Sequence, residues 1–184
     1  MIFFHNPKTA GRSAIEMLGF VEDPNPKFIH MTATDARNRI FQEEWGRYYS
    51  FAFVRNPWER MVSLYHYHQT LDYGLFQGFN VSHQLARQYE FNEWLTINTQ
   101  NRAKSAWFGV PQTVWTDSVS QVYRFEKFEE NWRAICERFD LTFDPIHKNS
   151  TSHGQFRDYY ASQRELDMVA EIDAETIKTF DYTI

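Results

Sequence analysis

Short apolar and aromatic runs, each ended by a polar turn, predict the strands of a sheet. The first run begins at Ile2 and stops at Pro7, and His5 is expected to lie within this strand. The second run, residues 48–54, is almost continuously apolar or aromatic, which is typical of a central parallel strand covered on both faces. A third run lies at residues 121–125, and a shorter candidate covers residues 27–30. We expect these strands to pair into a mainly parallel sheet.

Apolar positions three and four residues apart predict helices between and after the strands. Trp58, Met61, Val62 and Tyr65 form one such stripe, and Ser63 lies off it. We therefore expect Ser63 to be available to a ligand rather than to the core. Further helices are predicted at residues 14–18, 33–40, 82–95, 126–138 and 163–173.

Two of these helices carry start signals of their own. Thr32 offers a capping hydroxyl and Asp35 an acid three residues later, which is the pattern of a capping box. Asn56 is a favourable N-cap residue, and Pro57 suits the first turn of a helix. The central strand is therefore expected to pass directly into a helix.

Strands that alternate with helices favour an α/β fold in three layers. We predict a P-loop-like domain with a central, mainly parallel sheet flanked by helices. A length of 184 residues fits one domain, 1–184, with a core large enough to fold without cross-links. The hydrophobic content of 42% and the aromatic content of 18% supply that core.

The charge balance excludes general nucleic-acid binding. The chain has 19 Lys and Arg against 24 Asp and Glu, a net charge of −5, whereas nucleic-acid binders carry a basic excess. Cys136 is the single cysteine, so no disulfide forms within the chain. Neither a secretory signal nor an apolar run of membrane-spanning length is recognised. We expect a cytoplasmic protein with no membrane span.

The turn after the first strand has the composition of an anion-binding loop. A strand, a turn of small and polar residues and a helix present several backbone N–H groups to a bound oxyanion. Ammonium, guanidinium and hydroxyl groups in the turn add donors and charge. The expected binding residues are Lys8, Thr9, Ala10, Gly11, Arg12 and Ser13.

A second basic residue, Arg55, follows the central strand, and Ser63 lies eight positions later, 63 − 55 = 8. Parallel strands bring their carboxyl ends to one edge of the sheet, so this position and the first loop are expected at the same edge. An anion that contacts both needs negative groups some distance apart. A nucleotide with phosphates at both ends has this property.

These residues resemble a known family. Residues 7–13 are similar to the 5′-phosphosulfate loop of sulfotransferases that depend on 3′-phosphoadenosine 5′-phosphosulfate (PAPS), and residues 51–63 are similar to their 3′-phosphate motif. The likeness is closest to the carbohydrate-type, Golgi-like branch, in which an arginine and a serine eight positions on bind the 3′-phosphate. It extends to residues 124–128 and 158–182, and it is weak between about residues 71 and 119. The chain looks like a short soluble member of that branch.

The resemblance implies transfer of a sulfuryl group from PAPS to a hydroxyl, or as second choice an amine, of a carbohydrate or small-molecule acceptor. The product is 3′-phosphoadenosine 5′-phosphate (PAP), and no metal is required. Lys8 is expected to stabilise the charge of the leaving phosphate, and His30 to act as the general base. Lys148 and Ser150 are expected to add contacts at the 3′ end of the nucleotide.

Two other functions stay open at the level of sequence. A phosphoryl-transferring P-loop enzyme needs a lysine after the second glycine of its loop, whereas Lys8 precedes Gly11. A non-catalytic module that binds PAP or a carbohydrate differs only by lacking the base. The aromatic residues between 98 and 116 suit either an acceptor pocket or a layer packed on the core. The sequence indicates neither the acceptor nor the oligomeric state.

Overall fold

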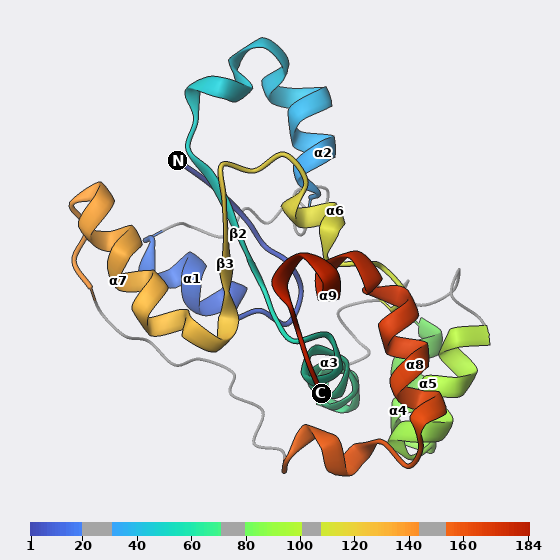
Figure 1. Ribbon diagram of the computed structural model, residues 1–184. Coiled ribbons are helices and arrows are strands. Elements are labelled where there is room, and N and C mark those ends of the chain that lie inside the picture. The colour runs from blue at the N-terminus through green and yellow to red at the C-terminus, as the bar shows by residue number, and fades with distance from the viewer. Residues whose placement is uncertain (20–30, 71–79, 101–107, 144–153) are drawn as a thin grey trace. The chain divides into compact units, whose positions relative to one another are not determined.

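The computed structural model describes residues 1–19, 31–70, 80–100, 108–143 and 154–184 (Figure 1). The chain divides into two compact units. The first unit consists of Met1–Arg55 and Gln112–Ser150, and the second of Asn56–Pro111 and Thr151–Ile184. The expectation of one domain over residues 1–184 stays a prediction.

A parallel three-stranded sheet is the centre of the first unit. Its strands are β1 (Ile2–Phe4), β2 (Ser50–Val54) and β3 (Gln121–Arg124), in the order β1-β2-β3 (Figure 1). Phe51 of β2 lies opposite Phe3 of β1 and Gln121 of β3. The predicted strands at these places and their parallel direction are confirmed. The short strand expected at residues 27–30 lies outside the described residues.

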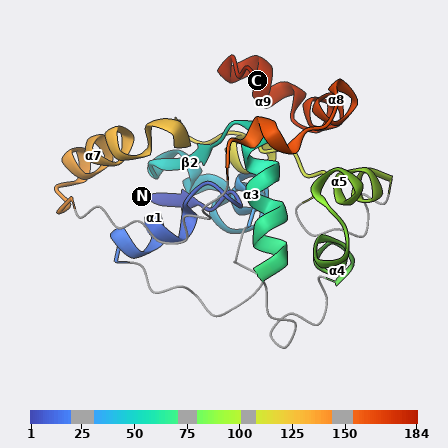
Figure 2. The same cartoon turned by 90° about the horizontal axis from the view of Figure 1, so that it is seen from below.

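Side chains of β2 alternate between the two faces of this sheet. Phe51 and Phe53 pack with helices α1 (Gly11–Met17) and α7 (Phe128–Phe139), which lie on the same side of the strands in Figures 1 and 2. Ala52 packs into a second cluster, with Phe4 and with Ala33 and Ala36 of helix α2 (Ala33–Ala36). The first unit therefore has helices on both faces of a sheet whose central strand is buried, and the predicted α/β class is confirmed.

A local capping signal determines where helix α2 of the first unit starts. Thr32 caps α2, since its Oγ1 accepts a hydrogen bond from the backbone N–H of Asp35, as the capping box predicts. Helix α7 begins slightly later than expected, after a 3-10 turn at Phe125–Lys127. The remaining elements are a π-helical segment at Arg37–Phe41, a 3-10 segment at Gln42–Arg47 and helix α6 (Thr113–Thr116).

Helix α3 (Pro57–Thr70) opens the second unit. Asn56 caps it, because its Oδ1 accepts hydrogen bonds from the backbone N–H groups of Trp58 and Glu59 at 3.1 and 3.3 Å. The predicted apolar stripe of this helix is buried throughout. The unit also contains α4 (Asn80–Gln88), α5 (Phe91–Gln100), a 3-10 turn at Phe156–Tyr159, α8 (Gln163–Ile172) and α9 (Ala174–Phe180).

The prediction of one helix over residues 82–95 is wrong. Helix α4 ends at Gln88 and α5 begins at Phe91. The break lets Trp94 donate from Nε1 to the carbonyl and the hydroxyl of Ser82, at 3.0 and 3.1 Å. In one continuous helix those two residues would stand about 18 Å apart along the axis. Burial of the Trp94 side chain therefore outweighs the local helical pattern.

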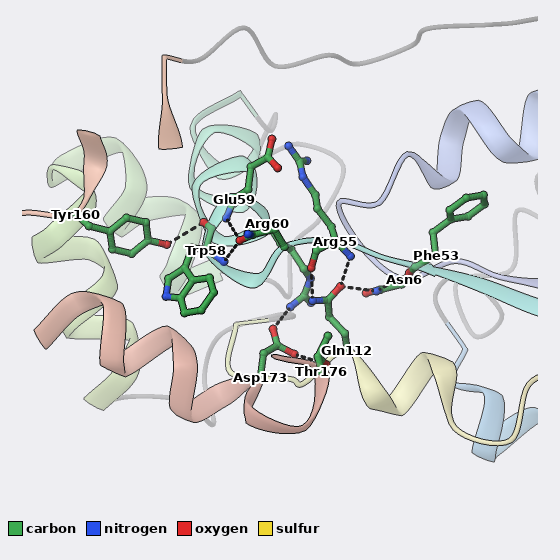
Figure 3. A network of polar contacts seen from close by, with 11 residues as sticks. Asn6, Phe53, Arg55, Trp58, Glu59, Arg60, Gln112, Tyr160, Asp173 and Thr176 are labelled. Carbon is green, nitrogen blue, oxygen red and sulfur yellow. Dashed lines mark hydrogen bonds and ion pairs between the residues drawn. The ribbon is translucent and has the colours of Figure 1, made fainter. Parts of the chain in front are cut away.

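Buried polar groups tie the second unit together (Figure 3). Arg60 forms an ion pair with Asp173 at 3.3 Å, and Thr176 donates a hydrogen bond to the same carboxylate at 3.2 Å. Tyr160 donates from its hydroxyl to the carbonyl of Trp58 at 2.8 Å. Because Arg60 and Asp173 are both almost fully buried, removing one partner would leave an uncompensated charge in the core.

The aromatic residues between 98 and 116 that the structure describes are core residues. Phe108, in the second unit, packs edge-on against Trp94, and Trp115, in the first unit, is buried. Their burial favours packing over an aromatic acceptor pocket. Within the parts of the chain that the structure describes, no helix combines the length and apolarity needed to cross a membrane.

Candidate functional site

The loop between β1 and α1 has an unusual backbone. Lys8 and Ala10 have positive φ angles of 69° and 60°, whereas Thr9 between them does not. Such alternation turns successive N–H groups towards one side, which is the geometry of an anion-binding nest. Each left-handed residue with a side chain costs about 1–2 kcal/mol, so the loop stores strain of a kind found at functional sites.

Hydrogen bonds within the loop hold this shape. Thr9 donates from Oγ1 to the carbonyl of Asn6 at 2.8 Å, and the backbone N–H of Asn6 donates to the carbonyl of Phe4 at 3.1 Å. The side chains of Asn6, Thr9 and Ser13 are buried. The Thr9 hydroxyl, predicted to contact a ligand, therefore supports the loop from within.

Gly11 lies directly against the imidazole of His5. A Cβ atom at this position would overlap the ring, which stacks on Phe3 with the centroids 6.2 Å apart. His5 follows the last residue of β1 and sits at the carboxyl end of that strand. Gly11 is therefore required by the close approach of this ring at the start of α1.

We expect the Gly11→Ala substitution to destabilise the first unit by about 1–3 kcal/mol, because the added methyl group has to displace the His5 ring. Thermal unfolding measures this effect. The double variant His5→Ala/Gly11→Ala should regain part of the loss, since the obstructing ring is gone. Gly46→Ala is the control, because a Cβ there meets nothing within 4 Å. A Gly11→Ala protein as stable as wild type would contradict the overlap.

Three cations gather at this loop. The pKa of Lys8 is lowered from 10.5 to about 8, first by burial and then by the guanidinium groups of Arg55 and Arg12. All three causes disfavour the ammonium form in the unliganded protein. A bound anion would stabilise that form, so the electrostatics of the loop suit a ligand with several negative charges.

Arg55 joins the loop from the end of β2. Its side chain is only 8% exposed, and its Nη1 donates to the carbonyl of Lys8 at 3.2 Å. The guanidinium also lies over the ring of Phe125, with Cζ 4.4 Å from the ring centroid, in cation–π geometry. The structure thus brings the two predicted basic positions together in the first unit, at the carboxyl edge of the sheet.

Comparison with known families gives one decisive match. The family model for the sulfotransferase family matches residues 1–180. The chain belongs to the sulfotransferase family. No curated protein and no solved structure gives a significant match. Family membership supports sulfuryl transfer as the general activity.

The structure gives different outcomes for the other predicted site residues of this sulfotransferase-family chain. Ser63 is on α3 in the second unit and is 2% exposed, so the expectation that it stands clear of the buried face is wrong. The reason is that residues on every side of the middle of α3 are buried, and not only those of the apolar stripe. Arg12 is exposed. His30, Lys148 and Ser150 lie outside the described residues.

Two residues of the site escaped the sequence interpretation. Phe125 supports the Arg55 guanidinium, and its signal was present, because it follows the third strand and so lies at the carboxyl edge of the sheet, where ligands of such sheets commonly bind. Gln112 holds the backbone of Arg55 from 57 positions away in the sequence. A glutamine before a short helix carries no local signal of such a role.

Proposed function

We propose that this sulfotransferase-family chain uses PAPS as its sulfuryl donor and transfers the group to a hydroxyl, or as second choice an amine, of a carbohydrate or small-molecule acceptor. One observation carries the proposal. A strained loop bearing Lys8 meets Arg55 at the carboxyl edge of a parallel sheet, through the hydrogen bond from Arg55 Nη1 to the Lys8 carbonyl. Family membership makes sulfuryl transfer the reaction to be tested there.

The residues present fit a phosphosulfate donor. Burial and the guanidinium groups of Arg55 and Arg12 lower the pKa of Lys8 and so disfavour its charged form when no anion is bound. Charge-assisted hydrogen bonds from an ammonium and a guanidinium are the strong contacts that phosphate recognition uses. The two left-handed residues of the loop add backbone donors. The site therefore combines fixed positive charge with oriented N–H groups.

Each residue of the candidate site has a proposed role in binding or transfer. PAPS supplies the sulfuryl group and leaves as PAP. The Lys8 ammonium stabilises negative charge on the 5′-phosphate oxygen as the bond to sulfur breaks. The loop at residues 8–13 holds the 5′ end, and Arg55 holds the 3′-phosphate. Ser63 joins the 3′ contacts on the strength of the motif at residues 51–63, and Lys148 and Ser150 do so on the strength of the polar composition of residues 147–154.

His30 is proposed as the base that takes the proton of the acceptor hydroxyl. We expect His30→Ala to lower kcat by about a hundredfold while the Kd for PAP changes little, because the base contacts the acceptor and not the nucleotide. Steady-state kinetics with PAPS and calorimetry with PAP measure the two effects. Full turnover of the variant would exclude His30 as the base.

Two other functions differ from this one, the first in the nucleotide that is bound and the second in turnover. A P-loop kinase would prefer ATP with Mg²⁺, and its motif is not matched because Lys8 precedes Gly11. A non-catalytic module would bind PAP without turning over PAPS. The carbohydrate-type branch, a cytoplasmic location and independence from metals belong to the proposal as well.

Calorimetric titration with PAP, ATP and AMP, with and without Mg²⁺, tests the proposal. We expect tight, metal-independent binding of PAP and weaker binding of AMP and ATP. Preference for ATP with Mg²⁺ would overturn it in favour of phosphoryl transfer. PAP binding without release of PAP from PAPS, over a panel of sugars and small alcohols, would favour the non-catalytic module.

A further inference from the structure

The side-chain amide of Gln112 forms two hydrogen bonds with the backbone of Arg55, one to its N–H and one to its carbonyl (Figure 3). Its Oε1 accepts from the Arg55 N–H at 3.0 Å, and its Nε2 donates to the Arg55 carbonyl at 2.8 Å. Gln112 is fully buried. Arg55 is the first residue beyond β2, where the backbone pairing with β3 ends at Val54. The glutamine amide thus continues the hydrogen bonding of the strand by one residue.

Asn6, in the anion-binding loop, hydrogen-bonds to the Gln112 amide and so holds it in place. Its Nδ2 donates to Gln112 Oε1 at 3.0 Å and to the carbonyl of Phe53 at 2.9 Å. The Gln112 oxygen therefore accepts two N–H donors. A reversed amide would turn an NH₂ group towards both donors and an oxygen towards the Arg55 carbonyl, so the network permits one orientation.

The contacts form a closed circuit within the first unit. Asn6 binds Gln112, Gln112 binds the backbone of Arg55, and the Arg55 side chain binds the carbonyl of Lys8. Pro7 connects Lys8 to Asn6 along the backbone, which closes the circuit. Because the circuit fixes both the backbone and the head of Arg55, the guanidinium has little freedom to leave the loop.

This network of hydrogen bonds includes one unfavourable feature at Asn6. Asn6 Oδ1 is buried and has no hydrogen-bond partner among the described residues. An unsatisfied buried acceptor costs about 1–3 kcal/mol. The two hydrogen bonds that Asn6 Nδ2 donates, to the Phe53 carbonyl and to Gln112, offset this cost.

We propose that Gln112, supported by Asn6, is a positioning residue that sets the selectivity of the site for a nucleotide with a 3′-phosphate. It acts through Arg55 and does not touch the ligand. This inference rests on the proposed function, in which Arg55 binds the 3′-phosphate. A misplaced guanidinium would lose that phosphate while the 5′ contacts of the Lys8 loop persist.

The test compares the Kd values for PAP and for AMP, which lacks the 3′-phosphate. Wild type should prefer PAP. In Gln112→Met, which removes the amide but keeps the volume, that preference should fall by about tenfold or more while the Kd for AMP changes by less than about threefold. Gln112→Asn keeps the amide on a shorter side chain, and it serves as the second variant if the first does not fold.

Ser50→Ala is the matched control. Ser50 is also buried, and its Oγ accepts from the backbone N–H of Ser120 at 3.0 Å, at the opposite end of β2. We expect this variant to lower Tm and to leave the preference for PAP intact. Equal loss of preference in both variants would mean that destabilisation alone is responsible, and would overturn the inference.

A double-mutant cycle gives a readout that a merely structural role would not produce. With Arg55→Ala as background, Gln112→Met should cause no further loss of affinity for PAP, since its effect runs through the guanidinium. An additional tenfold loss of PAP affinity in that background would contradict a positioning role. If wild type itself shows no preference for PAP, the proposed function fails. If wild type prefers PAP and Gln112→Met does too, only the inference fails.

Discussion

The Lys8→Met variant is expected to lose sulfuryl transfer and yet to unfold at a higher temperature than wild type. The ammonium is the proposed stabiliser of the leaving phosphate, and removal of such a group lowers turnover by about a hundredfold to a thousandfold. The same ammonium is disfavoured in the unliganded fold by burial, Arg55 and Arg12, which together lower its pKa to about 8. Sulfuryl transfer therefore requires an ammonium group at position 8, whereas the stability of the unliganded fold favours an uncharged side chain there.

The lowered pKa also determines how stability depends on pH. Between pH 8 and 10.5 the unfolded chain holds the Lys8 proton that the folded chain has released. The free energy of unfolding should therefore rise with pH across this window, by at most about 3 kcal/mol. Below pH 8 the penalty is fully present, which is why the methionine variant is more stable near neutrality.

Thermal unfolding of both proteins from pH 6 to pH 10 measures the effect, together with turnover of PAPS. The Tm difference in favour of Lys8→Met should be a few degrees at pH 7 and should shrink towards pH 10. Lys127→Met is the control, because that lysine is exposed and pairs with Glu130 on the surface. A Lys8→Met protein that is less stable at every pH would show that the ammonium is well solvated or paired in the folded state.

Affinity for PAP also depends on the protonation of Lys8, but it should fall as the pH rises, whereas the stability should increase. Above pH 8 the unliganded protein loses the Lys8 proton, so binding of the anion has to restore it. We expect the affinity of wild type to fall by up to about tenfold per pH unit there. Lys8→Met should show weaker binding without this slope.

Arg55→Ala is expected to remove the preference for PAP over AMP, with a loss of PAP affinity of about tenfold to a hundredfold and little change for AMP. The substitution deletes the hydrogen bond to the Lys8 carbonyl and the cation–π contact with Phe125. Charge-assisted contacts to phosphate are worth about 1.5–3 kcal/mol each. Calorimetry with the two nucleotides measures the loss.

Arg55→Lys separates charge from shape at this position. A lysine keeps the positive charge but lacks the planar fork that both contacts use, so most of the preference for PAP should still be lost. Arg124→Ala is the control, since this arginine lies at the end of β3 and is 42% exposed. Equal effects of the Arg55 and Arg124 variants would indicate a general field of positive charge instead of a defined contact.

Local sequence determined much of the fold. The run of five apolar or small residues in β2 and the caps at Thr32 and Asn56 depend on neighbours within a few positions, and the structure confirms them. The loop after β1 was also recognisable, because a turn with a lysine, a glycine and hydroxyls between a strand and a helix is a local pattern. Parallel strands then placed Lys8 and Arg55 at one edge.

Tertiary structure decided what depends on contacts far apart in the sequence. The break between α4 and α5 exists because Trp94 returns to Ser82, and Ser63 is buried because α3 is covered on nearly every side. Gln112 reaches Arg55 across 57 positions, a distance at which periodicity and capping carry no information. The sequence by itself thus determined most of the elements and the charged groups of the site. Packing and long-range hydrogen bonds determined how firmly Arg55 is held.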